Sequence, residues 1–225
     1  MNLIAKADMK IGRYITKKQD IKIDTRVCGQ SLAEYVPSIN RDDAKGTVGT
    51  GSDSTHYSAL KKIFSDVTLT SSDALIDVGC GKGRILAFLL NENCPAQLYG
   101  IEYNEEVGKL AQEWTERYDQ AHIMIGDALT LDYNPYTFLT LARSFLPKTF
   151  MEFIKHLEEN LTHPITFISW YEQSTGRVLD NRPGWTKLQS GEILRINGLR
   201  LYPKPQAYSI RRYDPPVATG GQGAY

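Results

Sequence analysis

The chain has 225 residues, of which 41% are hydrophobic, so it is long enough for one sizeable domain with a hydrophobic core. Its 26 Lys and Arg residues balance its 26 Asp and Glu residues, which argues against a nucleic-acid partner or a membrane surface. No segment is typical of a signal peptide or a membrane span, and the three cysteines lack metal-ligand spacing. These features predict a soluble, cytoplasmic protein with reduced thiols and no metal site.

Three regions differ in composition along the chain. Residues 1–53 are polar and weakly patterned, and we predict that they form an N-terminal extension that acts as a lid on the core. Residues 54–213 alternate helical and strand patterns and form the predicted core. Residues 214–225 end in the glycine-rich stretch VATGGQGAY, which predicts a flexible tail.

The core opens with helix, strand and helix signals. Residues 54–64 have apolar side chains at helical spacing, and Ser54 and Thr55 are candidate N-terminal caps. The nearly continuous apolar run at 73–78 is typical of a buried parallel strand. Residues 84–90 then predict a helix.

The alternation continues through the middle of the chain. Residues 97–102 predict a second strand, after which Asn104 is placed to cap a helix. The apolar residues of that helix recur at helical spacing between 107 and 114. Two further strands are predicted at 122–126 and 136–142.

The last part of the core predicts one more helix and several strands. Thr149 and Glu152 have the spacing of a capping box at the start of a helix, and 164–172 predicts a fifth strand. Residues 185–213 have the turn glycines and prolines of further strands. Alternating strands and helices favour a parallel sheet that is covered on both faces. Such a sheet binds ligands at the carboxyl ends of its strands, where the strand order reverses.

The turn after the first strand, DVGCGKGR, is unusually rich in glycine. A Walker-type phosphate loop is excluded because Lys82 is followed by Gly83 and Arg84 rather than by Ser or Thr. The dinucleotide fingerprint matches at Gly79 and Gly81, but Arg84 stands in place of its third glycine. The resulting G-x-G-x-G pattern favours a ligand without a pyrophosphate. A glycine turn that only reverses the chain is the alternative.

Three acidic residues follow three successive predicted strands. Asp77 is suited to an ammonium group, Glu102 to ribose hydroxyls, and Asp127 to an adenine amino group. Glu102 alone also fits a helix-terminus acid, and Asp127 alone fits a turn former. Together the three acids and the glycine turn predict a site for S-adenosylmethionine.

With DVGCGKGR, GIEYNEE and IGDA in this order, residues 55–172 resemble the class I S-adenosylmethionine-dependent methyltransferases. The pieces KIDT and HYSALKKIF resemble the lead-in of small bacterial members. The resemblance implies a Rossmann-like α/β fold: a seven-stranded, mostly parallel sheet with helices on both faces and the last strand antiparallel. It also implies that Tyr57 closes over the sulfonium. The implied cofactor-binding residues are Tyr57, Asp77, Gly79, Cys80, Gly81, Gly83, Glu102, Tyr103, Asp127 and Ala128.

The sequence departs from this family after the fourth strand. Many relatives have an Asn-Pro-aromatic motif there, whereas this chain has Arg143, Ser144 and Phe145. Methylation of an amine through the usual carbonyl clamp is therefore in doubt. Arg143 is either a ligand for a carboxylate or phosphate of the acceptor or a surface cation. Phe145 and Tyr171 complete the candidate substrate residues, and Tyr171 is equally compatible with an aromatic core position.

The predicted activity is methyl transfer to a small-molecule or protein acceptor. Asp53, His56, Tyr171 and Glu172 are candidate general bases, but no spacing selects one, so no catalytic residue is assigned. One alternative is a non-catalytic cofactor-binding or interaction protein of the same fold. An aminopropyl transferase is disfavoured, because Arg143 stands where extra acids for a polyamine are expected. The sequence does not predict the oligomeric state.

Overall fold

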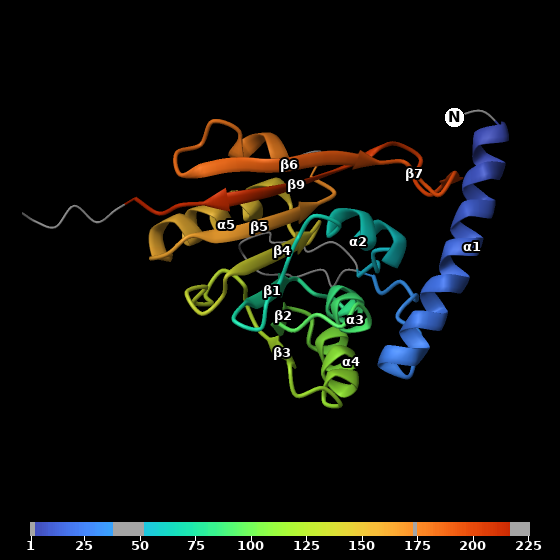
Figure 1. Ribbon diagram of the computed structural model, residues 1–225, viewed down its shortest axis with the longest axis horizontal. Helices are drawn as coiled ribbons and strands as arrows, with labels where there is room; N and C mark the ends of the chain where they lie inside the picture. The colour runs from blue at the N-terminus through green and yellow to red at the C-terminus, as the bar shows by residue number, and fades with distance from the viewer. Residues whose placement is uncertain (1–2, 38–51, 173–174, 217–225) are drawn as a thin grey trace, which may run out of the picture.

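The computed structural model describes residues 3–37, 52–172 and 175–216. Its main feature is a seven-stranded sheet with the strand order β3-β2-β1-β4-β5-β9-β6 (Figure 1). A separate two-stranded hairpin is formed by β7 and β8. The strands are β1 (Ala74–Val78), β2 (Gln97–Glu102), β3 (Ala121–Ile125), β4 (Phe138–Ala142), β5 (Ile165–Trp170), β6 (Trp185–Ile193), β7 (Arg195–Ile196), β8 (Leu199–Arg200) and β9 (Gln206–Tyr213).

The strand order reverses beside β1. This strand pairs in parallel with β2 on one side and with β4 on the other. The last strand, β9, lies between β5 and β6 and is antiparallel to both. The predicted Rossmann-like sheet, mostly parallel with an antiparallel last strand, is therefore confirmed. The strands predicted at 73–78, 97–102, 122–126, 136–142 and 164–172 all form, with ends shifted by one or two residues.

Helices cover the sheet on both faces. Neighbouring residues of β1 separate the two cores: Leu75 packs in the core next to α1, α2 and α3, and Ile76 packs in the core next to α5. This follows from the alternation of side chains along a strand. No helix in the described parts of the chain is both long and apolar enough to cross a membrane. The helices are α1 (Leu3–Cys28), α2 (Tyr57–Ile63), α3 (Arg84–Asn91), α4 (Glu105–Thr115), α5 (Pro147–Asn160) and the 3₁₀ turn η1 (Gly176–Leu179).

One of the predicted helix caps is confirmed. The Asn104 side chain accepts hydrogen bonds from the backbone N–H groups of Glu106 and Val107 at 3.0 and 3.3 Å. This satisfies two of the donors that the first turn of α4 leaves without a partner.

Two other cap predictions are wrong. Helix α2 has His56 at its N-cap position without a side-chain cap, and Ser54 instead donates to the carbonyl of Leu32 at 2.8 Å. Helix α5 begins at Pro147 after Leu146, so Thr149 lies inside the first turn instead of capping it. Proline supplies the start because its fixed φ suits the first helical turn, where its missing N–H is not needed.

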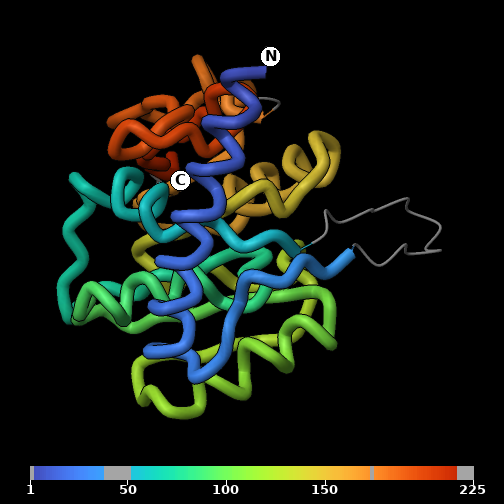
Figure 2. Tube along the Cα trace, turned by 90° about the vertical axis from the view of Figure 1, so that its right-hand side faces the viewer, coloured from blue at the N-terminus to red at the C-terminus, as the bar shows by residue number. Residues whose placement is uncertain are grey.

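Helix α1 is the element that the sequence pattern did not predict. It has 26 residues and runs along one side of the molecule, from the C-terminal strands to the region of α3 and α4 (Figures 1 and 2). Its buried face is mainly polar and recurs at a spacing of four, at Gly12, Thr16, Asp20 and Asp24. A search for apolar periodicity therefore does not find it. Residues 217–225 of the predicted tail and part of the extension at 1–53 lie outside the described residues.

A buried ion pair attaches α1 to the core. Arg84 begins α3, and its Nη2 lies 2.6 Å from Oδ2 of Asp24, which is completely buried. Asp24 Oδ1 also accepts the hydroxyl of Tyr57 at 2.8 Å, and Asp24 Oδ2 accepts the N–H of Leu32 at 2.9 Å. Asp20, the next buried acid on α1, lies 3.7 Å from Arg84 Nη1. The arginine at the position of the missing third glycine thus anchors the N-terminal helix.

This network predicts that Arg84 is a principal determinant of stability. Replacing it by methionine leaves two buried carboxylates without their cation, and removal of one partner of a buried ion pair typically costs about 3–5 kcal/mol. We expect Arg84→Met to lower the free energy of unfolding in urea by that amount. The matched control is Arg212→Met, because Arg212 pairs with Asp214 at the exposed surface and such pairs contribute about 1 kcal/mol or less. Equal losses in the two variants would contradict the anchoring role.

Candidate active site

The glycine turn links β1 to α3 in a left-handed backbone conformation. Gly79, Gly81 and Gly83 have φ values of 67°, 56° and 83°, which residues with a side chain rarely adopt. The N–H groups of Gly79 and Cys80 both donate to the carbonyl of Ile101, at 2.8 and 3.0 Å. The turn is therefore fixed against the end of β2.

The three glycines have different neighbours. A Cβ on Gly79 would lie 2.4 Å from the side chain of Ser144, and a Cβ on Gly81 would lie 2.7 Å from Ser52 Oγ. A Cβ on Gly83 would lie 2.8 Å from the ring of Trp114 on α4. Gly83 thus has a packing role, and its predicted contact with the cofactor stays a prediction.

Two other predicted residues next to the turn lie in different surroundings. Cys80 is buried with its sulfur against Gly100 of β2, where a Cβ would come within 2.7 Å of it. Burial raises the pKa of the Cys80 thiol well above its ordinary value, so the thiol is neutral. Tyr103 is half exposed at the rim.

Glu102 is held at the rim of the turn by two backbone donors. Its Oε2 accepts the N–H of Gly81 at 2.8 Å and its Oε1 accepts the N–H of Asn104 at 2.9 Å. Burial raises the pKa of Glu102, and these two hydrogen bonds oppose the rise. Each carboxylate oxygen has a second lone pair, so the group can also accept two neighbouring hydroxyls.

Asp77 lies below the turn and is only 2% exposed. Its Oδ1 accepts the hydroxyl of Thr140 on β4 at 2.7 Å. Burial raises the pKa of Asp77 to about 7, the Thr140 hydrogen bond opposes this, and the charge of Glu102 adds to it. Near neutral pH its charge therefore responds to any cation that binds nearby.

Asp127 and Ala128 form a turn after β3. Asp127 is exposed and its Oδ1 accepts the N–H of Leu129 at 2.9 Å, as a turn-forming aspartate does. Ala128 is buried, and its carbonyl accepts the hydroxyl of Tyr133 at 2.9 Å. These contacts account for the local structure, and the predicted adenine contact stays a prediction.

The structure gives other partners to Tyr57 and to two candidate bases. Tyr57 donates its hydroxyl to Asp24, as described above, and is buried. His56 Nδ1 lies 2.6 Å from Asp20 Oδ2. Glu172 is buried, and its Oε2 lies 2.9 Å from Nη1 of Arg211. An ion-paired carboxylate is a poor general base because its charge is already compensated. Asp53, the remaining acid among the candidates, is exposed.

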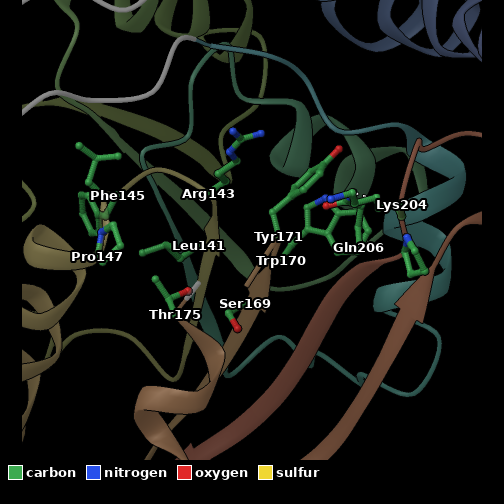
Figure 3. A pocket seen from close by; sticks show the side chains of 12 residues that line it. Leu141, Arg143, Phe145, Pro147, Ser169, Trp170, Tyr171, Thr175, Lys204 and Gln206 are labelled. Carbon is green, nitrogen blue, oxygen red and sulfur yellow. Dashed lines mark hydrogen bonds between the residues drawn. The ribbon is translucent and has the colours of Figure 1, made fainter. Parts of the chain in front are cut away.

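All three candidate substrate residues line one cavity at the carboxyl ends of β4 and β5. Figure 3 shows Phe145 and Pro147 on one side of it and Lys204 and Gln206 on the other. The cavity has a volume of about 380 Å³. Its lining residues are Leu141, Arg143, Phe145, Leu146, Pro147, Ser169, Trp170, Tyr171, Thr175, Lys204, Pro205 and Gln206.

Ser144 connects this cavity to the glycine turn. Its hydroxyl donates to the carbonyl of Val78 at 2.8 Å and lies 3.3 Å from the carbonyl of Gly79. Its sequence neighbours Arg143 and Phe145 line the cavity. The cavity and the turn are thus two parts of one site at the point where the strand order reverses.

Residues 69–168 match a protein-family model described as a methyltransferase domain. This segment is therefore similar to a methyltransferase domain, and the sheet around it has the Rossmann-like fold of methyltransferases. The matched segment includes the glycine turn and both Glu102 and Asp127. In the described parts of the chain, no group of three or more His, Cys, Asp or Glu residues is arranged to hold a metal ion.

Solved structures of several methyltransferases have a similar fold. An RNA methyltransferase from Salinibacter ruber, in complex with S-adenosyl-L-homocysteine, is 19% identical with a TM-score of 0.53, over 76% of this chain and 99% of that one. The tRNA methyltransferase TrmK of B. subtilis is 11% identical with a TM-score of 0.56, over 69% and 65% of the two chains. TrmN from Thermus thermophilus is 14% identical with a TM-score of 0.51, over 70% and 48%.

Several residues of the site were not predicted from the sequence. Thr140 has the strand alternation of β4 but no motif that pairs it with Asp77. Ser144 was noted only as a departure from the family motif. Lys204 and Gln206 precede or begin β9, about sixty residues from β4, and no local signal relates the two segments. Only the insertion of β9 beside β5 brings them to the cavity.

The raised pKa of Asp77 predicts a pH-dependent stability of the ligand-free protein. A carboxyl with a pKa of about 7 in the folded state and an ordinary value of 3.8 favours folding in its protonated form, and this stabilisation is lost as the pH rises through 7. Asparagine cannot ionise and keeps an oxygen to accept from Thr140. We therefore expect Asp77→Asn to raise the Tm, relative to the parent protein, more at pH 8 than at pH 5.

Thermal unfolding at the two pH values tests this expectation. Asp119→Asn is the control, because Asp119 is exposed after α4. A difference between Asp77→Asn and the parent that is the same at both pH values would contradict the assigned pKa.

Proposed function

We propose that this protein transfers a methyl group from S-adenosylmethionine to a small-molecule or protein acceptor in the cavity at the ends of β4 and β5. The observation that carries the proposal is the position of Glu102. Its carboxylate is locked to the N–H of Gly81 at the ends of β1 and β2, and the same turn contacts Ser144 beside the cavity. One site thus combines an acceptor for ribose hydroxyls with a separate space for a second substrate.

The residues around the turn fit the cofactor. The glycines give the turn a left-handed backbone without side chains, which would let an adenosine and an amino-acid tail approach the main chain. Glu102 would accept the ribose hydroxyls, and Asp77 would be drawn into its charged form by an ammonium group. Asp127, exposed after β3, is available on the adenine side. When bound, S-adenosylmethionine supplies an already activated methyl group.

The protein's own part in the reaction is to position the acceptor. Alignment of two reactants contributes up to about 7–11 kcal/mol in favourable cases, so a strong general base is not required. The cavity walls are apolar at Leu141, Phe145 and Trp170, which would exclude water and orient the apolar part of a bound acceptor. The hydroxyl groups of Ser169, Tyr171 and Thr175 lie on the wall, where they would exchange hydrogen bonds with the polar part of the acceptor.

Calorimetric titration with S-adenosylmethionine, S-adenosylhomocysteine and NAD tests the cofactor assignment. We expect micromolar binding of the first two and no binding of NAD. Glu102→Gln removes a charged acceptor of hydrogen bonds, and such bonds contribute about 1.5–3 kcal/mol, so we expect a loss of affinity of about 10–100-fold. Glu105→Gln is the control, because Glu105 is exposed in the first turn of α4. Tight binding of NAD alone, or unchanged affinity in Glu102→Gln, would contradict the proposal.

Formation of S-adenosylhomocysteine tests the transfer itself. The protein is incubated with S-adenosylmethionine and three sets of acceptors: small molecules, protein extracts and tRNA transcripts. We expect turnover with members of the first or second set. Turnover with tRNA alone would replace the proposed acceptor class. Tight cofactor binding without turnover on any set would favour a non-catalytic protein of this fold.

A further inference from the structure

Two residues at the cavity have an unusual backbone conformation. Five non-glycine residues in the described parts of the chain have positive φ, and three of them are asparagines, which tolerate this region. The other two are Arg143 and Tyr171, with φ values of 58° and 60°. Strained conformations of this kind persist where the surrounding structure holds them, and they gather at functional sites.

These two strained residues are neighbours in space. Ala142 pairs with Trp170 at the ends of the parallel strands β4 and β5, so Arg143 and Tyr171 leave the sheet side by side. The guanidinium carbon of Arg143 lies 5.9 Å from the centre of the Tyr171 ring. Both line the cavity, and Figure 3 shows their side chains projecting from adjacent strand ends. The left-handed turn at each position therefore directs both side chains to the mouth of the same cavity.

The cavity has charged side chains of one sign only among its described lining residues, and the acid Asp53 acts on Tyr171 from outside this lining. Its twelve described lining residues include two cations, Arg143 and Lys204, and no Asp or Glu. Glu172, the acid that directly follows Tyr171, is buried and paired with Arg211, so its charge is compensated. The remaining wall is largely apolar and aromatic. This combination fits a ligand with an apolar body and one anionic group.

We propose that the methyl acceptor is a small molecule that carries a carboxylate or phosphate on an apolar body, and that Arg143 selects it. The inference rests on the proposed function, because it places the acceptor in this cavity. The guanidinium binds an oxyanion with two parallel N–H donors, and the face of Tyr171 supports the guanidinium from one side. A volume of about 380 Å³ suits a small molecule and not a folded macromolecule.

The backbone strain allows a test that separates binding from folding. Arg143→Gly removes the charge and suits the positive φ, so we expect the protein to stay folded while anion affinity falls at least tenfold. The matched control is Asn197→Gly, because Asn197 has a φ of 50° on the β7–β8 hairpin and does not line the cavity. It makes the same kind of glycine substitution at a positive φ, and we expect it to leave anion affinity unchanged. Lys148→Met is the control for loss of charge. It removes an exposed cation near the start of α5 that does not line the cavity, so anion affinity is expected to stay unchanged.

The probes are aromatic and aliphatic carboxylates, phosphate esters of the same bodies, and their neutral amides. Each is titrated by calorimetry into the protein saturated with S-adenosylhomocysteine. We expect anions to bind at least tenfold more tightly than the matched amides, and the comparison of carboxylates with phosphates identifies the anion. For any probe that is methylated, Arg143→Gly is expected to raise KM at least tenfold with a smaller change in kcat.

The possible failures are distinguishable. Equal binding of anions and amides, no binding by any anion, or unchanged anion affinity in Arg143→Gly would overturn this inference while leaving the proposed function in place. Failure of S-adenosylmethionine itself to bind would instead overturn the proposed function.

Discussion

The parallel pairing of β1 on both of its edges is the constraint on which the site depends. Val78 pairs with Ile101 of β2 and with Leu141 of β4, so the ends of three strands reach one edge of the sheet together. The glycine turn leaves from the middle of this edge, with Glu102 on one side and the cavity on the other. The strands β2 and β4 lie on opposite sides of β1, so the strand order reverses at this edge. Such a reversal leaves a crevice beyond the strand ends, which is where ligands bind in sheets of this type.

Four buried or partly buried acids in the described parts of the chain fall into two groups. Asp24 and Glu172 are each paired with a buried arginine, and their charges hold elements together. Asp77 and Glu102 are stabilised by neutral donors: a hydroxyl in one case and backbone N–H groups in the other. Burial without a cation raises the pKa of both, which leaves them ready to respond to a positively charged or hydroxyl-rich ligand. The group that contacts each carboxylate thus distinguishes the acids that hold elements together from the acids of the proposed site.

Much of the fold was predictable because local patterns act over short stretches. Apolar runs located the five parallel strands, Asn104 was a correct cap, and the glycine spacing located the turn. The predictions failed where tertiary contacts replaced local signals. Helix α1 buries a polar face because Arg84 lies beneath it, so its sequence lacks the apolar period of an ordinary surface helix.

The sequence by itself thus determined the sheet, the glycine turn and the acids at the strand ends, since these depend on residue type and short spacing. Only the tertiary structure decided which of these residues meet. It placed Arg84 in a buried ion pair with Asp24 of α1, and it directed the Tyr57 hydroxyl to the same carboxylate. It also brought Lys204 to the cavity of Arg143 by inserting β9 beside β5. Such contacts join segments tens of residues apart, and no local propensity encodes them.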